Sequence, residues 1–420
     1  MKAVLKIDPE KFGRAIAAIG NIVPSRPSMP DLANFIIRRD RERDLFTLTA
    51  SDNDSLLVLD CVTYTTDSEG NTVMEKFVEV AEEDERAPFE SVSINWADVK
   101  NIINTLPKSM ILRATIVLDG DAGEMDVNYN IGNFSLPVRS SATFPLIPDV
   151  VTEEGDPNGI QPVCTMQIPA GKSLVKYISQ ASGCAANDEL RPQMNCVALD
   201  CSIEQITVVA SDGHKLYRRI LPLGAGYMTR KFFPAEQTYI ALVPKNAVRT
   251  LSAVNKNDGE MTVSVDSQRI SWVGKTFKLI SRQTEGRFPN YAAVIPTSHK
   301  WSATFFTQGL RTALGRLGLF WNVASLVTVK RSGNDIILKA EDIDFGKKAA
   351  EKVAILNGDC GLPENEVYGL KGDVLSALLS IISTDNATFH FDDANRPVII
   401  QEDVNNPDLT LLQMPMLINR

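Results

Sequence analysis

Ala210-Ser211-Asp212-Gly213-His214-Lys215-Leu216 is the stretch that organises this chain, because its first three residues end a predicted strand and recur elsewhere. The same small acidic triplet stands at Ala50-Ser51-Asp52 and, in a looser form, at Ala340-Glu341-Asp342. An apolar helical seam precedes each triplet, and a second seam and a residue-proline pair follow it. The pairs are Phe144-Pro145, Phe288-Pro289 and Met414-Pro415. A period of about 130 residues exceeds the roughly 20 to 50 residues of a solenoid unit and predicts three domains.

Each repeat has the pattern of an α+β domain. In the three successive repeats, the first helical seam contains Phe12, Ile16 and Ile19, then Leu174 and Ile178, then Leu310, Leu314 and Leu317. The second helical seam contains, in the same order of repeats, Val99, Ile103 and Leu106, then Val248 and Leu251, then Val374 and Leu378. Short strands rich in Val, Ile and Thr separate the seams, so two helices must cover one face of antiparallel sheets in every repeat. Linkers after the first two proline pairs predict domains at 1–150, 162–297 and 298–420, with residues 151–161 as a surface loop.

Composition indicates a cytoplasmic protein without a disulfide framework. The 420 residues are 44% hydrophobic and 23% charged, and no apolar run approaches the roughly 18 to 20 residues that span a bilayer. The N-terminus alternates like a strand and has no signal-peptide pattern. The six cysteines form no Cys-x-x-Cys pair, so we expect them to be reduced and partly buried.

The net charge of −9 hides a separation of charge between helices and the rest of the chain. Helices are predicted at 9–20, 95–108, 169–186, 244–256, 306–320 and 370–382, where twelve basic residues face three acidic ones. The helices therefore carry +9 and the remainder −18. Solvated helix faces usually bring Glu along with Lys, so the excess favours a polyanion on the helical side. About two basic residues per helix would give weak, sequence-independent attraction that permits sliding.

No segment has the pattern of a catalytic site, a metal site or a cofactor site. Ser211, Asp212 and His214 stand in tandem on one predicted turn, whereas a triad must converge in space. Asp52 with Asp54, and Asp342 with Asp344, lack a third carboxylate and fit solvated turns. No phosphate-binding glycine loop is present. We therefore expect a non-catalytic protein that needs no cofactor and no metal.

The middle repeat and the C-terminal tail depart from the repeat pattern. Gly213-His214-Lys215-Leu216 follows the middle triplet, and this mixture of an open turn with polar and apolar side chains suits a bound peptide. The tail, Leu411 to Leu417, is apolar and rich in Met, which is common on adaptable binding surfaces. The tail also fits a final core strand, and alternate residues could serve both purposes.

These residues resemble the bacterial DNA polymerase III β subunit family, the sliding clamps. The resemblance is carried by Ala210 to Leu216, by Glu285-Gly286-Arg287-Phe288-Pro289-Asn290-Tyr291 with Val294-Ile295-Pro296, and by Met414-Pro415-Met416; Pro24 to Pro30 is a further match. It implies three similar domains per chain, each with two helices on antiparallel sheets, and two chains joined head to tail in a ring. The implied function is non-catalytic: the ring encircles duplex DNA without sequence preference and tethers polymerase at a high local concentration. The implied partners are the polymerase III α subunit, the clamp loader and other clamp-motif proteins of replication and repair, with no membrane.

The resemblance also implies three sets of site residues. A peptide-binding cleft between the second and third domains would use Met194, Ser211, Gly213, His214, Lys215, Leu216, Pro244, Val248, Val398, Leu412, Met414, Pro415 and Met416. The DNA-facing residues would be helix cations from the charge count, to which the resemblance adds Arg26 as the best candidate outside the helices; the helix cations are Lys11, Arg14, Lys100, Lys172, Lys176, Lys245, Arg249, Arg311 and Arg316. The dimer interface would use Phe134, Leu136, Leu319 and Phe320.

The chain departs from the family pattern at Leu417, where a basic residue is usual, and at Asp373, where a Tyr is frequent. It is also longer than is usual, mainly through residues 65–88 and 151–161, which we expect to be surface loops. Two rival functions remain open. A metal-dependent nuclease or hydrolase would bring Asp52, Asp212 and Asp342 together, and a protein-interaction scaffold of three α+β repeats would not encircle DNA.

Overall fold

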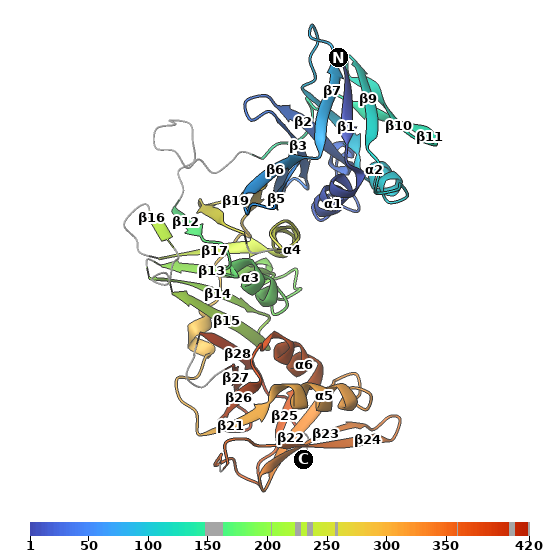
Figure 1. The fold of residues 1–420 in the computed structure, drawn as a ribbon. Coiled ribbons are helices and arrows are strands. Elements are labelled where there is room, and N and C mark those ends of the chain that lie inside the picture. The colour runs from blue at the N-terminus through green and yellow to red at the C-terminus, as the bar shows by residue number, and fades with distance from the viewer. Residues whose placement is uncertain are drawn as a thin grey trace. The chain divides into compact units, whose positions relative to one another are not determined.

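The computed structural model describes residues 1–147, 163–202, 204–222, 228–232, 238–256, 259–358, 360–402 and 408–418 (Figure 1). The predicted loop at 151–161 lies outside these ranges. The chain divides into two compact units. The first unit comprises Met1–Lys176, Gly226–Gln237 and Val243–Gln283, and the second comprises Tyr177–Ala225, Thr238–Leu242 and Thr284–Arg420.

Most strands of the first unit belong to one 14-stranded sheet. Its order is β16 (Met228–Phe232), β12 (Cys164–Ile168), β18 (Met261–Val265), β19 (Arg269–Gly274), β20 (Phe277–Arg282), β4 (Ser55–Asp60), β3 (Leu45–Ser51), β2 (Asn34–Asp40), β8 (Ser91–Asn95), β11 (Gly132–Arg139), β10 (Ala122–Tyr129), β9 (Leu112–Asp119), β1 (Lys2–Ile7) and β7 (Val78–Glu83). The antiparallel β20–β4 pair makes this sheet continuous between segments more than 200 residues apart in sequence.

Two further sheets form the second unit. The eight-stranded sheet has the order β17 (Thr238–Pro244), β13 (Cys196–Ser202), β14 (Gln205–Ser211), β15 (Lys215–Pro222), β28 (Leu409–Gln413), β27 (Val398–Gln401), β26 (Asn386–Phe391) and β21 (Trp301–Phe306). The four-stranded sheet has the order β24 (Lys347–Ala354), β23 (Asp335–Asp342), β22 (Leu326–Ser332) and β25 (Tyr368–Lys371).

The described residues form six α-helices, one near each predicted window. They are α1 (Pro9–Ile19), α2 (Trp96–Ile103), α3 (Leu174–Ser182), α4 (Lys245–Val254), α5 (Thr307–Leu317) and α6 (Gly372–Ile381). The prediction of two helices in every repeat on antiparallel sheets is confirmed. Short 3₁₀ turns stand at Pro30–Ala33, Pro192–Met194 and Tyr291–Val294.

Helix α1 illustrates how local sequence produces these elements. The Asp8 carboxylate accepts hydrogen bonds from the backbone N–H groups of Glu10 and Lys11, which caps the helix, and Pro9 occupies the first turn. The predicted seam residues are buried against the sheet. Gly20, just after the helix, leaves room for the Trp96 ring, whose Nε1 donates to the Ile16 carbonyl at 2.8 Å. This contact joins α1 to α2.

All six helices are shorter than their predicted windows, which leaves Lys256 and Lys371 outside α4 and α6, and α2 and α3 are shortened most. Helix α3 begins only at Leu174 because Gly171 and Ser173 adopt positive φ angles of +77° and +56°, which cannot continue a right-handed helix. Helix α2 ends at Ile103, four residues before Pro107, and the chain continues as turns. Lys108 and Lys172 therefore lie outside the helices to which the prediction assigned them.

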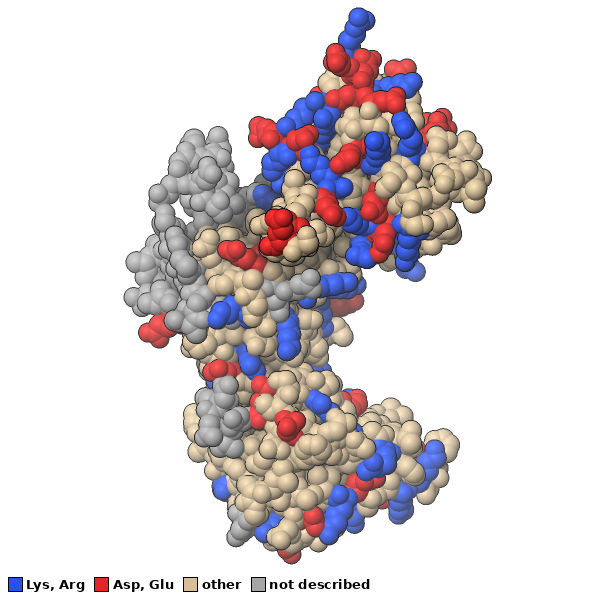
Figure 2. Space-filling model, viewed as in Figure 1, with Lys and Arg blue, Asp and Glu red and all other residues tan. Residues whose placement is uncertain are grey.

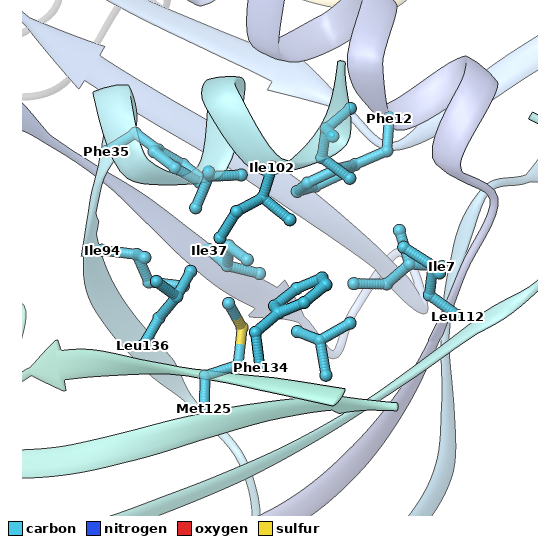
Figure 3. Close-up of a pocket in the computed structure, with 13 residues that line it drawn as sticks. Ile7, Phe12, Phe35, Ile37, Ile94, Ile102, Leu112, Met125, Phe134 and Leu136 are labelled. Carbon is cyan, nitrogen blue, oxygen red and sulfur yellow. The ribbon is translucent and has the colours of Figure 1, made fainter. Parts of the chain in front are cut away.

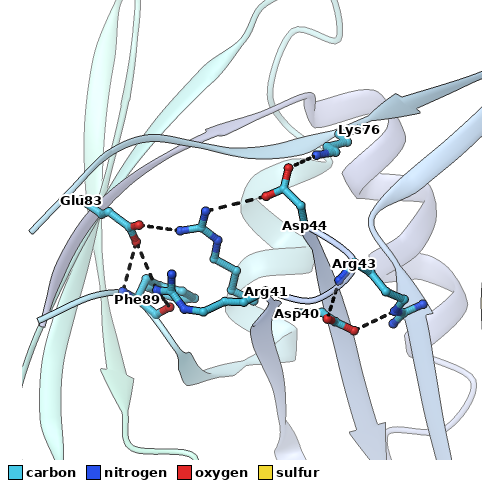
Figure 4. A network of polar contacts seen from close by, with 8 residues as sticks. Asp40, Arg41, Arg43, Asp44, Lys76, Glu83 and Phe89 are labelled. Carbon is cyan, nitrogen blue, oxygen red and sulfur yellow. Dashed lines mark hydrogen bonds and ion pairs between the residues drawn. The ribbon is translucent and has the colours of Figure 1, made fainter. Parts of the chain in front are cut away.

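The prediction that residues 65–88 form a surface loop is wrong. They contribute to a hairpin of β5 (Val62–Thr66) and β6 (Thr72–Lys76) and supply β7, which pairs with β1 at the sheet edge. Ionic contacts link the insertion to the β2–β3 turn (Figure 4): Lys76 contacts Asp44 at 2.7 Å, and Glu83 contacts Arg39 at 2.7 Å. The alternation of Val78 and Val80 with Glu79 was the available signal for a strand.

All six cysteines are buried and none forms a disulfide, in line with the prediction of reduced thiols. None of the helices in the described ranges combines the length and the apolar character needed to cross a membrane.

Candidate functional site

The middle triplet forms a tight turn between β14 and β15. The Asp212 carboxylate accepts hydrogen bonds from the N–H groups of His214 and Lys215, each at 2.8 Å. Gly213 has a φ of +90°, which glycine adopts without steric cost, and nothing lies within 4 Å of the space a Cβ would fill. Gly213 and His214 are exposed as a result.

A buried apolar cluster lies beside this turn, where β15 pairs with β28. Leu216 lies opposite Leu412 in the register, and the Met414 N–H donates to the His214 carbonyl at 2.8 Å. The cluster consists of Cys196, Ala198, Val209, Leu216, Leu242, Phe288, Ile399 and Leu412, with Tyr291 and Ile295 packed against it. The middle triplet, the Phe288-Pro289 segment and the tail therefore meet at one place in the second unit.

The structure brings most, but not all, of the predicted cleft residues into the second unit. Met194, Leu216, Val398 and Leu412 are buried, whereas Met414 is 37% exposed. Lys215 is half-buried and forms an ion pair with Asp212 at 2.9 Å. The tail is held by the Met416 N–H, which donates to the Gly369 carbonyl at 2.8 Å.

Pro244 and Val248 belong to the first unit, and Val248 is only 2% exposed. Phe288, Tyr291 and Ile295 are cluster residues that the sequence-based site omitted. All three stand in the segment 285–296, on which the family resemblance rests. The sequence therefore contained a signal for them, but it was used to identify the family and not to choose site residues. The Tyr291 hydroxyl donates to Asp200 at 2.6 Å, which fixes its ring against the cluster.

The first triplet forms the same turn at the β4–β20 pair, inside the first unit. The Asp52 carboxylate accepts from the N–H groups of Asp54 and Ser55 at 3.0 and 2.6 Å. Asn53 takes the place of Gly213 with a φ of +79°. The Arg282 N–H donates to the Asp54 carbonyl at 2.8 Å, as Met414 does to His214. Leu56 lies opposite Ile280, as Leu216 does opposite Leu412.

We call the β4–β20 pair with its turn the first junction and the β15–β28 pair with its turn the second junction. Both turns use the aspartate oxygens to satisfy backbone N–H groups. Asp342 accepts from the Phe345 N–H at 3.4 Å in the third repeat. In the described ranges, no group of three or more His, Cys, Asp or Glu side chains is placed to hold a metal ion. The three aspartates on which the hydrolase rival depends thus belong to three separate turns.

The predicted DNA-facing residues differ in how they are held. Arg311 donates to the Leu379 and Ile382 carbonyls at 2.7 and 2.5 Å, so it caps the end of α6. Arg249 donates to the Asn21 carbonyl at 2.8 Å and joins α4 to the segment after α1. Arg26 and Lys176 are exposed.

The remaining helix cations contact side chains nearby. Lys11 contacts Glu75, Arg14 contacts Glu10, and Arg316 contacts Glu351. The Lys100 ammonium lies 4.5 Å from the centre of the Trp96 ring. Figure 2 shows Lys and Arg interspersed with Asp and Glu over the first unit. Lys245 lies in the first turn of α4, and Lys172 precedes α3.

The predicted interface residues lie at two places in the fold where apolar side chains are incompletely buried. Phe134 and Leu136 are half-buried and point into an apolar pocket beneath α1 and α2 (Figure 3), which Phe12, Ile102 and Met125 also line. Leu319, by contrast, is 74% exposed just after α5, and Phe320 is half-buried. Strand β11, which carries Phe134 and Leu136, pairs with β8 only at Val138 and Arg139.

Comparison with known proteins agrees with this architecture. Residues 168–290 match a family model described as DNA polymerase III beta subunit, central domain. The solved structure of the DNA polymerase sliding clamp from Bacillus subtilis superposes with a TM-score of 0.79 at 18% identity and covers the whole of both chains. The chain has the sliding-clamp fold.

Curated relatives extend the likeness over nearly the full length. The beta sliding clamp of Pseudomonas aeruginosa is 22% identical over 412 residues, which is 98% of each chain. The beta sliding clamp of Synechocystis sp. is 24% identical over 418 residues and covers 96% of each chain. The resemblance to the DNA polymerase III β subunit family, noted from the turn and the two proline motifs, is confirmed.

Proposed function

We propose that this chain is a DNA sliding clamp, a processivity factor that encircles duplex DNA and tethers the replicative polymerase. The observation that carries the proposal is the repeated junction, in which the strand after the first and after the second acidic triplet pairs with the last strand of the next repeat. The full-length likeness to beta sliding clamps supports the same function.

A ring follows if the third junction forms between two copies of the chain. Strand β24 follows the third triplet and is the end strand of its sheet within the described residues. Strand β11 ends the first repeat, and in the described ranges Gly132–Pro137 pair on one side only, with β10. Exposed edges of this kind readily pair with another strand. We assign β24 of one copy to β11 of a second copy, so that two chains close a head-to-tail dimer of six domains.

The half-buried side chains fit this assignment. Phe134 and Leu136 line a pocket that lacks a complete cover, and Leu319 is an exposed leucine on the repeat that carries β24. Docking Leu319 and Phe320 against Phe134 and Leu136 would complete the core on the helix side. The predicted domains, 1–150, 162–297 and 298–420, are the repeating elements of this ring.

The DNA-facing surface in this proposal is the helix side. Arg26 and Lys176 are exposed, and Arg14 and Arg316 are 75% and 55% exposed despite their carboxylate partners. Exposed ion pairs contribute about 0 to 1 kcal/mol, so phosphates can compete for these cations. Arg311 supports the helix pair instead, because its guanidinium lies on backbone carbonyls. The resulting contact with DNA is weak and salt-sensitive, which suits sliding.

The partner site in this proposal is the second junction. Exposed Gly213, His214 and Met414 surround a buried apolar cluster, so a peptide could add hydrophobic anchors beside polar contacts. The polymerase α subunit, the clamp loader and other clamp-motif proteins would share this surface. The chain itself performs no chemistry in this account and acts in the cytoplasm, where the chromosome lies.

Retention on circular DNA tests the proposal. The protein is loaded by the host clamp loader onto a nicked plasmid, separated from free protein, and the plasmid is then cut once. A clamp stays on the circle in high salt and leaves within minutes of linearisation. Equal retention on circular and linear DNA, no association with either, or degradation of the plasmid would each reject the proposal, and the last two outcomes would point to a scaffold or a nuclease.

A further inference from the structure

The first junction has a pocket that corresponds to the partner site of the second. It measures about 340 Å³ and lies between residues 146–147 and the strands β2, β3, β4 and β20. Its floor is the small apolar cluster of Leu56, Ile147 and Ile280, with Val58 packed against it. Leu56 and Ile280 occupy the register positions of Leu216 and Leu412. Residues that follow a Phe-Pro pair pack on the apolar cluster of each junction. They are Ile147 at the first junction, and Tyr291 and Ile295 at the second.

The rim of this pocket is cationic. Arg38, Arg43 and Lys278 line it, together with the single carboxylate of Asp40 and the hydroxyls of Thr47 and Thr49. Arg43 is held in place by two aspartates, with Nε 2.7 Å from Asp40 and Nη1 2.9 Å from Asp60. The Arg38 side chain is exposed on this rim. Burial, and then the nearby charge of Arg43, lower the pKa of Lys278.

The same positions of the second junction have a different character. Lys278 corresponds to Thr410, and Val58 corresponds to Arg218, whose Nη2 donates to Thr410 at 2.9 Å. At the first junction Val58 stands at the position of Arg218, and Lys278, at the position of Thr410, lies beside Arg43. The repeated backbone therefore presents a surface that favours anions.

We propose that the first-junction pocket is a second peptide-binding site, which takes an acidic partner segment with an aliphatic anchor. The apolar floor receives the anchor, and Arg38 and Lys278 receive carboxylates on either side of it. An inorganic anion would use the rim and leave Leu56 and Ile280 uncovered. The volume of the pocket is near the lower end of the range for ligand sites, roughly 300 Å³, and fits one or two side chains. The inference takes the second-junction cleft of the proposed function as its template.

Fluorescence anisotropy of the full-length protein tests this site. The probe is a fluorescein-labelled hexapeptide of sequence Asp-Asp-Leu-Leu-Glu-Glu, compared with Asn-Asn-Leu-Leu-Gln-Gln and with Asp-Asp-Ser-Ser-Glu-Glu. The first peptide should bind saturably, and each of the others should bind at least about tenfold more weakly. Because exposed charges are screened, raising the salt from about 0.05 to 0.5 M should also weaken binding several-fold.

Matched variants locate the site. Arg38→Glu and Lys278→Gln should each weaken the first peptide about tenfold or more, whereas Met414→Ala at the second junction should leave its affinity unchanged. Arg38 is exposed, so its replacement is expected to fold, and the thermal unfolding temperature of each variant confirms this.

Three results would overturn the site. They are binding that is insensitive to both variants, binding that falls with Met414→Ala, and full displacement by inorganic phosphate with no preference for Leu over Ser. The proposed function has a separate test, because loss of retention on circular DNA with intact peptide binding would reject the clamp and leave this pocket standing.

Discussion

The first and second junctions share a backbone and differ in the side chains placed on it. Both have an Asx turn, a residue with positive φ and a backbone hydrogen bond donated from the end of the strand paired across the junction, with matching register at Leu56–Ile280 and Leu216–Leu412. The first places Arg38, Arg43 and Lys278 around a small apolar floor. The second surrounds a larger apolar cluster with His214 and Met414. The repeat therefore provides the same junction backbone twice, and substitutions at equivalent positions give each junction a different surface.

The aspartates show the same contrast in their protonation. Burial alone would raise the pKa of Asp212, but hydrogen bonds from the Lys215 ammonium and from backbone N–H groups hold it below its usual value. Asp52 has Ser55 at the equivalent position and no cation there. Burial therefore raises its pKa in spite of similar backbone bonds. One turn geometry thus gives two electrostatic outcomes, because Lys215 stabilises the charged form of Asp212 whereas the nearby charge of Asp54 adds to the effect of burial on Asp52.

The largest expected effect extends the comparison to the third junction. Leu319→Asp should convert the dimer to monomers, because burying an unpaired charge costs about 3 to 5 kcal/mol, or more than 100-fold in dimer affinity. Native mass spectrometry at micromolar concentration measures this against a species of twice 46.1 kDa. Val323→Asp is the control, since Val323 is likewise an exposed apolar residue in the single chain and lies outside the proposed contact. A wild-type protein that is monomeric, or a dimeric Leu319→Asp variant, would contradict the assignment.

The next effect separates the two intramolecular junctions. Met414→Ala should weaken a polymerase-derived clamp-motif peptide by about tenfold, because truncating an interface anchor typically costs more than about 1 kcal/mol. Arg282→Ala is the matched control, since the Arg282 and Met414 N–H groups make the equivalent bond in their junctions. Isothermal calorimetry would measure both. If Arg282→Ala weakened the peptide as strongly as Met414→Ala, the assignment of the peptide to the second junction would be wrong.

A smaller effect tests whether the two turns are the same. Gly213→Asn should cost less than about 1 kcal/mol in the free energy of unfolding, because Asn tolerates positive φ and occupies this position in the first junction. Gly213→Val should cost about 2 kcal/mol, since a β-branched residue is strained there. Urea denaturation distinguishes the two. Equal costs for Asn and Val would show that the turns differ.

The smallest effect concerns pH. Burial, opposed by a hydrogen bond to Gln401, lowers the pKa of His390 below 6.5, and nearby His299 lowers it further. The folded state then binds fewer protons than the unfolded state, so His390 contributes full stability above about pH 6.5 and loses it as the pH falls below that value. The register places Ser264 at the equivalent position of the first junction. His390→Gln should flatten the decline in melting temperature between about pH 7 and 5, and an unchanged decline would rule out this origin.

Sequence alone predicted the repeat, the six helices and the middle turn, because seams at helical spacing and a Gly after an acidic triplet are local signals. It failed where an outcome depended on residues distant in sequence. Phe288, Tyr291 and Ile295 join the cluster through packing on β15 and β28, which no spacing reveals. Arg311 donates its guanidinium to carbonyls at the end of α6, a contact between two helices that no local pattern indicates. The alternation at residues 78–80 did indicate a strand, but the acidic and polar composition of residues 65–88 led to the prediction of a loop.

Amide hydrogen exchange of two edge strands tests the central claim, that one junction geometry is used three times and the third time between two chains. In the wild-type protein at micromolar concentration, residues 132–137 and 347–354 should exchange slowly, like the paired β4 and β15. In Leu319→Asp both segments should lose protection together, while β4, β15, β20 and β28 keep theirs. Fast exchange of both edges in the wild-type protein, unchanged by the substitution, would contradict the account.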